Sequence, residues 1–195
     1  MAIKGINITR WIVIVMLLLT LGAIAGGIGY ADEEEKRRVD ISLSIFPRIV
    51  AVDNAFRTKL DDEGNARLLF LYDKNEERAQ ELADILREES QSIGGKLVLV
   101  SVLSVSGDLA NIRQFRPTAI FLSERFNDND LAKIINFMEE ENRLVFSPFS
   151  GDVERGVTVG ISVTSRIKPY FNLSALHRSK IEINALLMKM SKRYE

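Results

Sequence analysis

The middle of the chain alternates between two spacings of apolar residues. Short apolar runs rich in Val, Leu and Ile are typical of buried strands, whereas apolar residues three or four positions apart are typical of helices. On this pattern we predict strands at residues 66–72, 96–105, 118–122 and 143–146, helices at 76–92 and 128–141, and a short helix or turn at 107–115. Strands that alternate with helices of this length predict a mainly parallel sheet with helices on both faces.

The C-terminal part of the chain follows a different pattern. Two apolar runs at 157–163 and 167–173 are separated by the short turn Thr164-Ser-Arg, which predicts a β-hairpin and therefore a mixed sheet. A terminal helix with a broad apolar face is predicted from Ser174 to Ser191. The predicted fold class is thus α/β: a Rossmann-like, mixed but mainly parallel sheet flanked by helices, with a C-terminal hairpin and a terminal helix.

Residues 39–60 fit two periods. Apolar and polar residues alternate over 39–45, which favours a strand, whereas the apolar positions that follow fit a helix face better. Pro47 predicts a kink or a new helix start, because proline inside a helix costs about 3 kcal/mol. Further along, Gly94-Gly95 is predicted to end the helix at 76–92.

Residues 11–31 contain no charged side chain and follow the basic residues Lys4 and Arg10. An apolar helix of about 20 residues spans about 30 Å, enough to cross a bilayer. The segment is either a signal peptide, with a short apolar centre followed by small residues, or an uncleaved membrane anchor. Both alternatives export the remainder. We therefore predict a hydrophobic N-terminal helix within 1–31, a charged spacer at 32–38 and an α/β domain at 39–195.

Composition excludes several classes of protein. The chain has 195 residues, 46% of them hydrophobic, which is enough to build a core. Its net charge of −1 argues against nucleic acid as a partner, because a nucleic-acid-binding face needs an excess of cations. The absence of cysteine excludes disulfides and thiolate metal sites.

Polar residues follow several of the predicted strands. In open α/β sheets, ligands gather at the carboxyl ends of the strands. The candidates for a ligand or partner pocket at that edge are Asp73, Ser123, Glu124, Ser147 and Ser150. Each of these residues also suits a structural alternative, because Asp, Ser and Glu after a strand commonly cap the next helix.

No motif in the chain predicts catalysis, a metal or a cofactor. The single histidine, His177, cannot build the usual zinc set, and the Gly-x-Ser-x-Gly motif of serine hydrolases is absent. Neither a Walker loop nor a Gly-x-Gly-x-x-Gly fingerprint is present. We therefore expect a protein that is not an enzyme and holds no cofactor or metal.

The segment from Arg155 to Ser191 resembles the C-terminal signature of the YfiR-like family of bacterial periplasmic regulators. The resemblance rests on Asn172-Leu173 and on Leu187-Met-Lys-Met-Ser at the family's spacing, and more faintly on Phe46-Pro-Arg-Ile-Val, which resembles the end of the family's first helix. Structural roles are expected at the matching positions, among them Asn172 before the terminal helix. These positions are Arg48, Gly156, Asn172 and Leu187.

The chain also departs from the family's pattern. Lys180 stands where the family usually has Gly, and Glu182 and Asn184-Ala185 replace a Lys and a pair of Ser residues. The best-known members rely on cysteine pairs, so thiol-based redox sensing is excluded for this chain.

The resemblance implies a non-catalytic periplasmic protein, free or held at the inner membrane by an uncleaved N-terminal segment. Such a protein binds an inner-membrane signalling enzyme, typically a diguanylate cyclase but in principle a kinase, and restrains it until envelope signals relieve the block. Biofilm behaviour follows from that control, and a homodimer is expected. The alternative from the residues alone is a periplasmic small-molecule sensor or solute receptor, with a pocket around Asp73, Ser123 and Ser147.

Overall fold

The computed structural model describes residues 33–106 and 109–195. The predicted N-terminal hydrophobic helix, with its signal-peptide and anchor alternatives, lies outside these residues. Within the described part of the chain, no helix combines the length and apolar character needed to cross a membrane. One compact unit, Arg38–Glu195, contains the whole sheet and the helices that pack on it.

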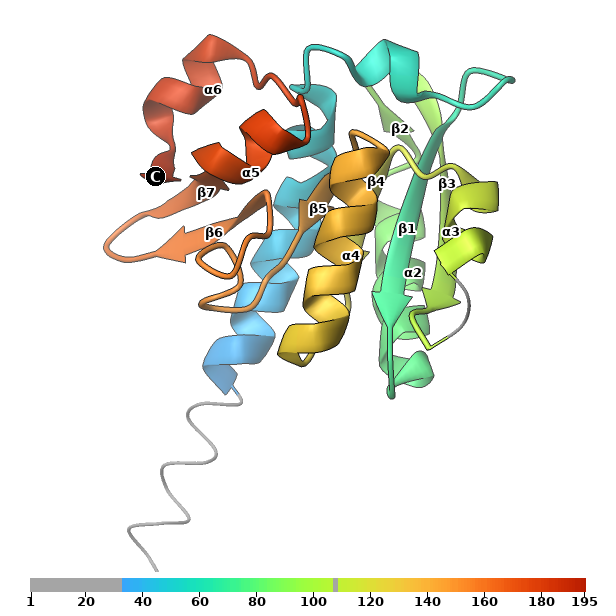
Figure 1. Ribbon diagram of the computed structural model, residues 1–195, viewed down its shortest axis with the longest axis horizontal. Coiled ribbons are helices and arrows are strands. Elements are labelled where there is room, and N and C mark those ends of the chain that lie inside the picture. The colour runs from blue at the N-terminus through green and yellow to red at the C-terminus, as the bar shows by residue number, and fades with distance from the viewer. Residues whose placement is uncertain (1–32, 107–108) are drawn as a thin grey trace, which may run out of the picture. The chain divides into compact units, whose positions relative to one another are not determined.

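The sheet has eight strands in the order β2-β3-β1-β4-β5-β6-β7-β8 (Figure 1). Its parallel centre confirms the predicted α/β class, and the antiparallel pairing of β6 with β7 confirms the predicted hairpin. The parallel strands are β1 (Ala66–Tyr72), β3 (Lys96–Ser104), β4 (Ala119–Leu122), β5 (Leu144–Phe146) and β6 (Val159–Val163), and β7 is Ile167–Asn172.

Helices cover both faces of the sheet. Residues of β1 alternate between two buried clusters, with Leu68 and Phe70 on one face and Leu69 and Leu71 on the other. The helix at residues 33–51 and α2 (Glu76–Glu89) pack on the first face, while α3 (Leu109–Phe115) and α4 (Asp128–Glu140) lie on the second. Figure 1 shows α4 in front of the sheet and helix 33–51 behind it.

A cluster of four phenylalanines holds helix 33–51 to the sheet. Phe70, Phe121 and Phe146 are register neighbours on β1, β4 and β5. The ring of Phe46 lies 5.3 Å from that of Phe121 and 5.5 Å from that of Phe146, centroid to centroid. All four side chains are fully buried, and aromatic pairs at such spacings add about 0.5–1.5 kcal/mol beyond their buried area.

The strand alternative for residues 39–45 is wrong, because residues 33–51 form one helix. The helix passes Pro47 without a break, and its first turn includes most of the predicted charged spacer. Val39, Leu43, Phe46 and Val50 recur at helical spacing and are all buried. This burial outweighs the hydrogen bond that proline cannot donate. A 3₁₀ turn, Phe56–Lys59, follows.

The predicted terminal helix is also wrong as one element, because the segment forms α5 (Leu173–Arg178), an extended link, and α6 (Ala185–Met190). Lys180 has a φ of 51°, and the amides of Lys180 and Ile181 donate to His177 O and Leu176 O. This pattern is a Schellman motif, which ends a helix. A short strand that the sequence analysis missed, β8 (Lys192–Tyr194), then pairs in parallel with β7.

The glycine pair at 94 and 95 has another role than the predicted helix stop. Helix α2 already ends at Ser90, and both glycines have positive φ in the two-residue turn between β2 (Ser92–Ile93) and β3. Positive φ at both positions is the pattern of a type I′ hairpin turn, which glycine adopts without strain.

Candidate functional site

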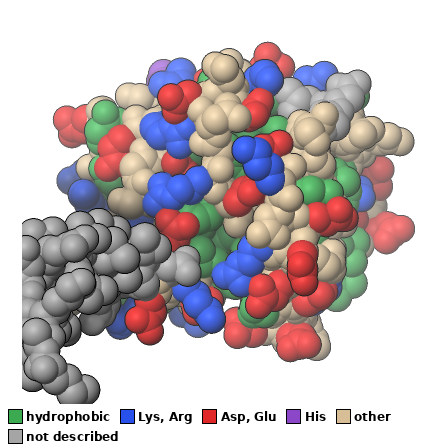
Figure 2. Space-filling view, turned by 90° about the horizontal axis from the view of Figure 1, so that it is seen from below, with side chains coloured by type: hydrophobic (Ala, Val, Ile, Leu, Met, Phe, Trp, Pro, Cys, Tyr) green, Lys and Arg blue, Asp and Glu red, His purple; other side chains and the backbone are tan. Residues whose placement is uncertain are grey.

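The crossover point of the sheet lies between β1 and β4. The chain runs from β1 outward to β3 and then returns to β4 on the other side of β1. Open α/β sheets usually bind their ligands at the carboxyl ends beside such a crossover. Asp73, Ser123 and Glu124 do come together there, as the sequence predicts. Figure 2, which views the molecule from below, shows acidic and basic side chains interspersed with small apolar patches.

Glu124 places a carboxylate of the chain itself at this crossover. Its Oε1 atom accepts hydrogen bonds from the backbone amides of Asp73, Lys74 and Asn75 at 2.5, 2.7 and 3.3 Å. The side chain of Asn75 in turn caps α2 by accepting from the amide of Arg78 at 2.9 Å. These amides are the donors that would otherwise hold an anionic ligand. The geometry at Glu124 is therefore that of an internal cap.

Ser147 and Ser150, the two predicted serines after β5, lie apart from Glu124 and the amides that it binds. Ser147 is fully buried, and its hydroxyl donates to Asp152 Oδ2 at 2.6 Å and accepts from the amide of Phe149 at 3.2 Å. It therefore shapes the loop that leads to β6. Ser150 is exposed on the same loop, where its carbonyl accepts from Arg125 at 3.1 Å. The five predicted residues do not converge on one pocket.

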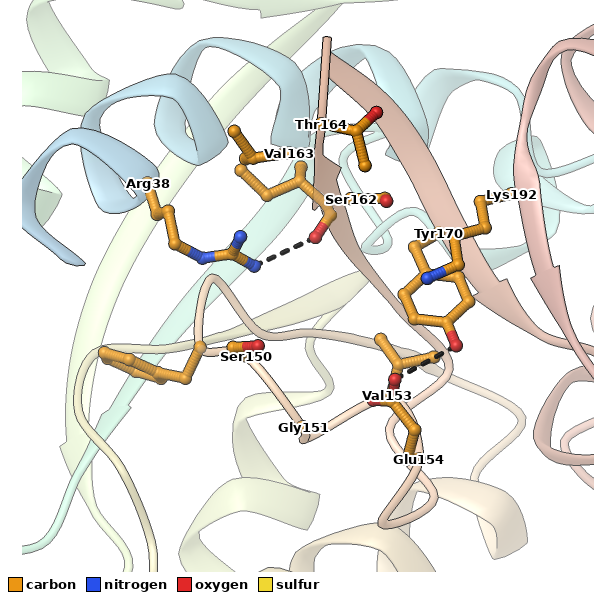
Figure 3. A pocket seen from close by; sticks show the side chains of 12 residues that line it. Arg38, Ser150, Gly151, Val153, Glu154, Ser162, Val163, Thr164, Tyr170 and Lys192 are labelled. Atoms are coloured by element: carbon orange, nitrogen blue, oxygen red, sulfur yellow. Dashed lines mark hydrogen bonds between the residues drawn. The ribbon is translucent and has the colours of Figure 1, made fainter. Parts of the chain in front are cut away.

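Ser150 instead borders a polar cavity of about 170 Å³ near the ends of β5 and β6 (Figure 3). One wall is Arg38, whose guanidinium donates to the carbonyls of Pro148 at 3.1 Å and Ile161 at 2.9 Å. The cavity is lined by Arg38, Phe149, Ser150, Gly151, Val153, Glu154, Ile161, Ser162, Val163, Thr164, Tyr170 and Lys192.

Tyr170 and Lys192 form the opposite wall. The Tyr170 hydroxyl donates to Glu154 Oε1 at 3.0 Å, and the ammonium of Lys192 lies 4.2 Å from the centre of the Tyr170 ring. Burial, and secondarily the bond to Glu154, raises the pKa of Tyr170 to about 12. The phenol therefore stays protonated at neutral pH. Two cations, one carboxylate and several hydroxyls suit the binding of a small polar molecule.

Sequence reasoning found only Ser150 of this cavity. The walls come from helix 33–51, the loop after β5, the β6–β7 hairpin and β8, which are distant in the chain. Because β8 was not predicted, Lys192 could not be placed beside Tyr170. No local signal marks the cavity.

The positions that match the YfiR-like signature are mostly structural in their contacts. Asn172 is buried: its Oδ1 accepts from the amide of Ala175 at 2.8 Å, and its Nδ2 donates to Val153 O at 2.7 Å. Gly156 has a φ of 112°, and a Cβ there would lie 3.2 Å from Ile135. Leu187 packs half-buried against the core, whereas Arg48 is exposed.

Large apolar side chains are exposed at both ends of the sheet. Leu97 and Leu99 on β3 are 55% and 38% exposed, and Leu186 and Met190 on α6 are 67% and 57% exposed. In the part of the chain that the structure describes, no cluster of three or more His, Asp or Glu residues is placed to hold a metal ion.

Comparison with models of known protein families and with characterised proteins found no match. Among solved structures, an ABC domain in complex with L-Trp from Streptococcus pneumoniae matches with a TM-score of 0.47 and 10% identity, covering 74% of this chain and 61% of that one. A conserved domain protein of Vibrio cholerae matches with a TM-score of 0.48 and 14% identity, covering 71% and 57%. This chain thus spans about three fifths of the length of those structures.

Proposed function

We propose that the chain is a non-catalytic periplasmic regulator that binds an inner-membrane signalling enzyme, such as a diguanylate cyclase or a kinase, and restrains it. The apolar segment at 11–31 supports export, and the resemblance of residues 155–191 to the YfiR-like signature supports the regulatory role. Glu124 and Ser147, two candidates for chemistry, are engaged in hydrogen bonds within the chain, which favours a binding role over a catalytic one.

The observation that carries the proposal is the exposed apolar face of β3. Leu97 and Leu99 are two residues apart on a strand and therefore point to the same side of the sheet. Beyond β3 lies β2, which pairs with Lys96 and Leu97. Val98 N then donates to Gln91 O and Arg87 donates to Val100 O, so the edge of β3 that no described strand covers begins after Val100. Open edges pair readily with a strand of another protein. Burying the exposed 55% of Leu97 and 38% of Leu99 would contribute roughly half of the about 1.5–3 kcal/mol that full burial of a leucine provides.

The test is affinity capture of solubilised inner-membrane proteins by the full chain, followed by mass spectrometry. We expect recovery of a cyclase or kinase with a periplasmic domain, and loss of that enzyme with the variant Leu97→Glu/Leu99→Glu. Val163→Glu is the matched control, because Val163 is 39% exposed but lies on β6. The captured enzyme, once purified, should lose activity when wild-type chain is added. Equal capture by the double variant, or no effect on activity, would contradict the proposal.

The cavity beside Tyr170 favours a second candidate function, a small-molecule sensor or solute receptor. Its site would be the cavity at Ser150 rather than the predicted pocket around Asp73, Ser123 and Ser147. A thermal-shift screen of small polar metabolites with the full chain should then give a saturable stabilisation. That shift should shrink in Lys192→Ala, which alters the cavity wall, and persist in Lys189→Ala, which removes a nearby cation outside it.

A further inference from the structure

We propose that α6 and β8 form a surface that docks on an anionic lipid bilayer. This α6–β8 surface consists of Leu186, Lys189, Met190, Lys192 and Arg193. It lies at the opposite end of the strand order from the β3 face, so the two surfaces can act at the same time. In Figure 1, α6 and the C-terminus lie beside β7, away from β3.

The first observation is that α6 is an apolar helix without a buried side chain. Five of its six residues are apolar (Ala-Leu-Leu-Met-Lys-Met), yet none is buried. Leu187 and Met188 pack half-buried against the core. Leu186 and Met190, one helical turn apart, are the two most exposed large apolar side chains of the described residues. Neighbouring apolar side chains that are this exposed are typical of a surface that is buried against a partner or a membrane.

The second observation is the state of the cations around these two side chains. Arg155 and Arg178, from the same part of the chain, are held by carboxylates. By contrast, Lys189, Lys192 and Arg193 make no ion pair with any residue that the structure describes, and Lys192 contacts only the Tyr170 ring face among the interactions resolved for it. Lys189 lies on α6 between Leu186 and Met190, and Lys192 and Arg193 follow in β8, so three cations without an ion pair among the described residues lie close to these two side chains in the chain.

The third observation is the uneven distribution of charge along the chain. Residues 155–195 contain eight Lys or Arg and two Asp or Glu, whereas residues 33–154 contain sixteen and twenty-four. The net charge is therefore +6 in the C-terminal part and −8 in the part before it. Arg155 and Arg178 of this part are paired with carboxylates of the preceding part, and the remaining excess of cations favours the approach of the C-terminal part to an anionic surface.

These observations fit a bilayer better than a groove on a partner. Leu186 and Met190 are exposed on α6, and Lys189 lies between them on the same helix. An apolar ridge bordered by Lys and Arg matches a surface that is anionic at the headgroups and apolar just below them. Each cation near such a surface strengthens partition by about fivefold, which corresponds to about 1 kcal/mol.

The experiment uses a single introduced cysteine, because the chain has none of its own. An environment-sensitive fluorophore is attached to Leu186→Cys in the full chain. The control is Gln80→Cys, at an exposed position of α2. Vesicles of phosphatidylcholine, with or without phosphatidylglycerol, carry a nitroxide-labelled lipid as quencher. We expect a blue shift and quenching at position 186 only on vesicles with phosphatidylglycerol, and neither at position 80. Both labelled variants carry residues 11–31, so any tethering by that segment is common to them.

Charge reversal then tests the role of the cations. Lys189→Glu/Lys192→Glu/Arg193→Glu should weaken the phosphatidylglycerol-dependent quenching by more than about 100-fold in lipid concentration. The control variant Arg57→Glu/Lys74→Glu/Lys133→Glu has the same net charge as the first triple variant and should leave the quenching unchanged. Circular dichroism shows whether both variants are folded. No quenching, quenching that ignores phosphatidylglycerol, or an equal effect of the two triple variants would overturn the proposal. A blue shift that appears without vesicles and grows with protein concentration would also overturn the proposal. It would indicate that a second copy of the chain covers the α6–β8 surface.

Discussion

At the scale of single residues, Lys180 adopts a left-handed backbone conformation that lysine does not favour. It occupies the position after α5 where a left-handed backbone is needed, with a φ of 51°. Glycine adopts this conformation without strain, whereas other residues lose about 1–2 kcal/mol there. Glycine is also what the YfiR-like signature usually has at this position. The departure noted in the sequence is therefore a site of local strain.

We predict that Lys180→Gly stabilises the protein. The free energy of unfolding should rise by about 0.5–1 kcal/mol, because the relief of strain exceeds the extra entropy that glycine gives the unfolded chain. Urea unfolding followed by circular dichroism measures the change. Lys180→Ala is the control, since it removes the same side chain but keeps a Cβ. An equal gain in both variants would show that the lysine side chain, and not its backbone, is unfavourable.

At the scale of elements, individual polar side chains join the ends of strands to the starts of helices. Glu124 links the end of β4 to the segment between β1 and α2. Asn172 links the end of β7 to α5 and to the loop before β6. Both side chains satisfy backbone groups that the regular hydrogen-bond ladders leave over. Glu124 therefore holds the start of α2 from a distant part of the sequence, whereas Asn172 caps the helix that directly follows it and ties that helix to the loop before β6.

Removing the Glu124 carboxylate should destabilise the protein. In Glu124→Ala the amides of Asp73 and Lys74 lose a charged acceptor, and we expect a loss of about 2–3 kcal/mol in the free energy of unfolding. Chemical denaturation measures the loss. Glu88→Ala, at an exposed position of α2, should change stability by less than about 0.5 kcal/mol. If Glu124→Ala were as mild as this control, solvent would already satisfy these amides.

At the scale of the whole molecule, a buried ion pair joins segments from all along the chain. Lys59 Nζ lies 2.5 Å from Asp53 Oδ2, with both side chains almost fully buried. Burial lowers the pKa of Lys59, and the contact with Asp53 partly opposes this. The carbonyl of Lys59 accepts from Thr118 and Arg143, and Asp53 forms a bridge with Ile183. The ion pair thus fixes a segment whose backbone contacts the residues before β4 and β5 and the link before α6.

Breaking this pair from one side should cost more than removing both charges. Lys59→Met leaves the Asp53 carboxylate buried without its cation, and we expect a loss of about 3–5 kcal/mol in stability. Lys59→Met/Asp53→Asn keeps an oxygen for the Ala55 amide and removes the buried charge, so its loss should be smaller than that of Lys59→Met alone. A double-mutant cycle by urea unfolding measures the coupling. Strictly additive losses would mean that the two side chains do not interact.

The sequence by itself determined the elements whose signals are local. The run at 66–72 coincides with β1, and Asn75, directly before the predicted helix at 76–92, accepts the Arg78 amide at the start of α2. Apolar periodicity and capping involve residues within a few positions of each other, so they can be read without the fold. The meeting of Asp73, Ser123 and Glu124 was predictable for a related reason, since the carboxyl ends of parallel strands share one edge of the sheet.

Tertiary structure decided what depends on residues far apart in the chain. The burial of Phe46 against three strands resolved residues 39–45 in favour of a helix, where the local pattern allowed both. The pairing of the link at 182–184 with residues 52–54 and of β8 with β7 divided the predicted terminal helix. Those pairings also created the cavity at Tyr170 and placed α6 outside the core. Backbone pairing between segments that are not adjacent in the chain leaves no periodic trace in the sequence, so only the folded chain reveals it.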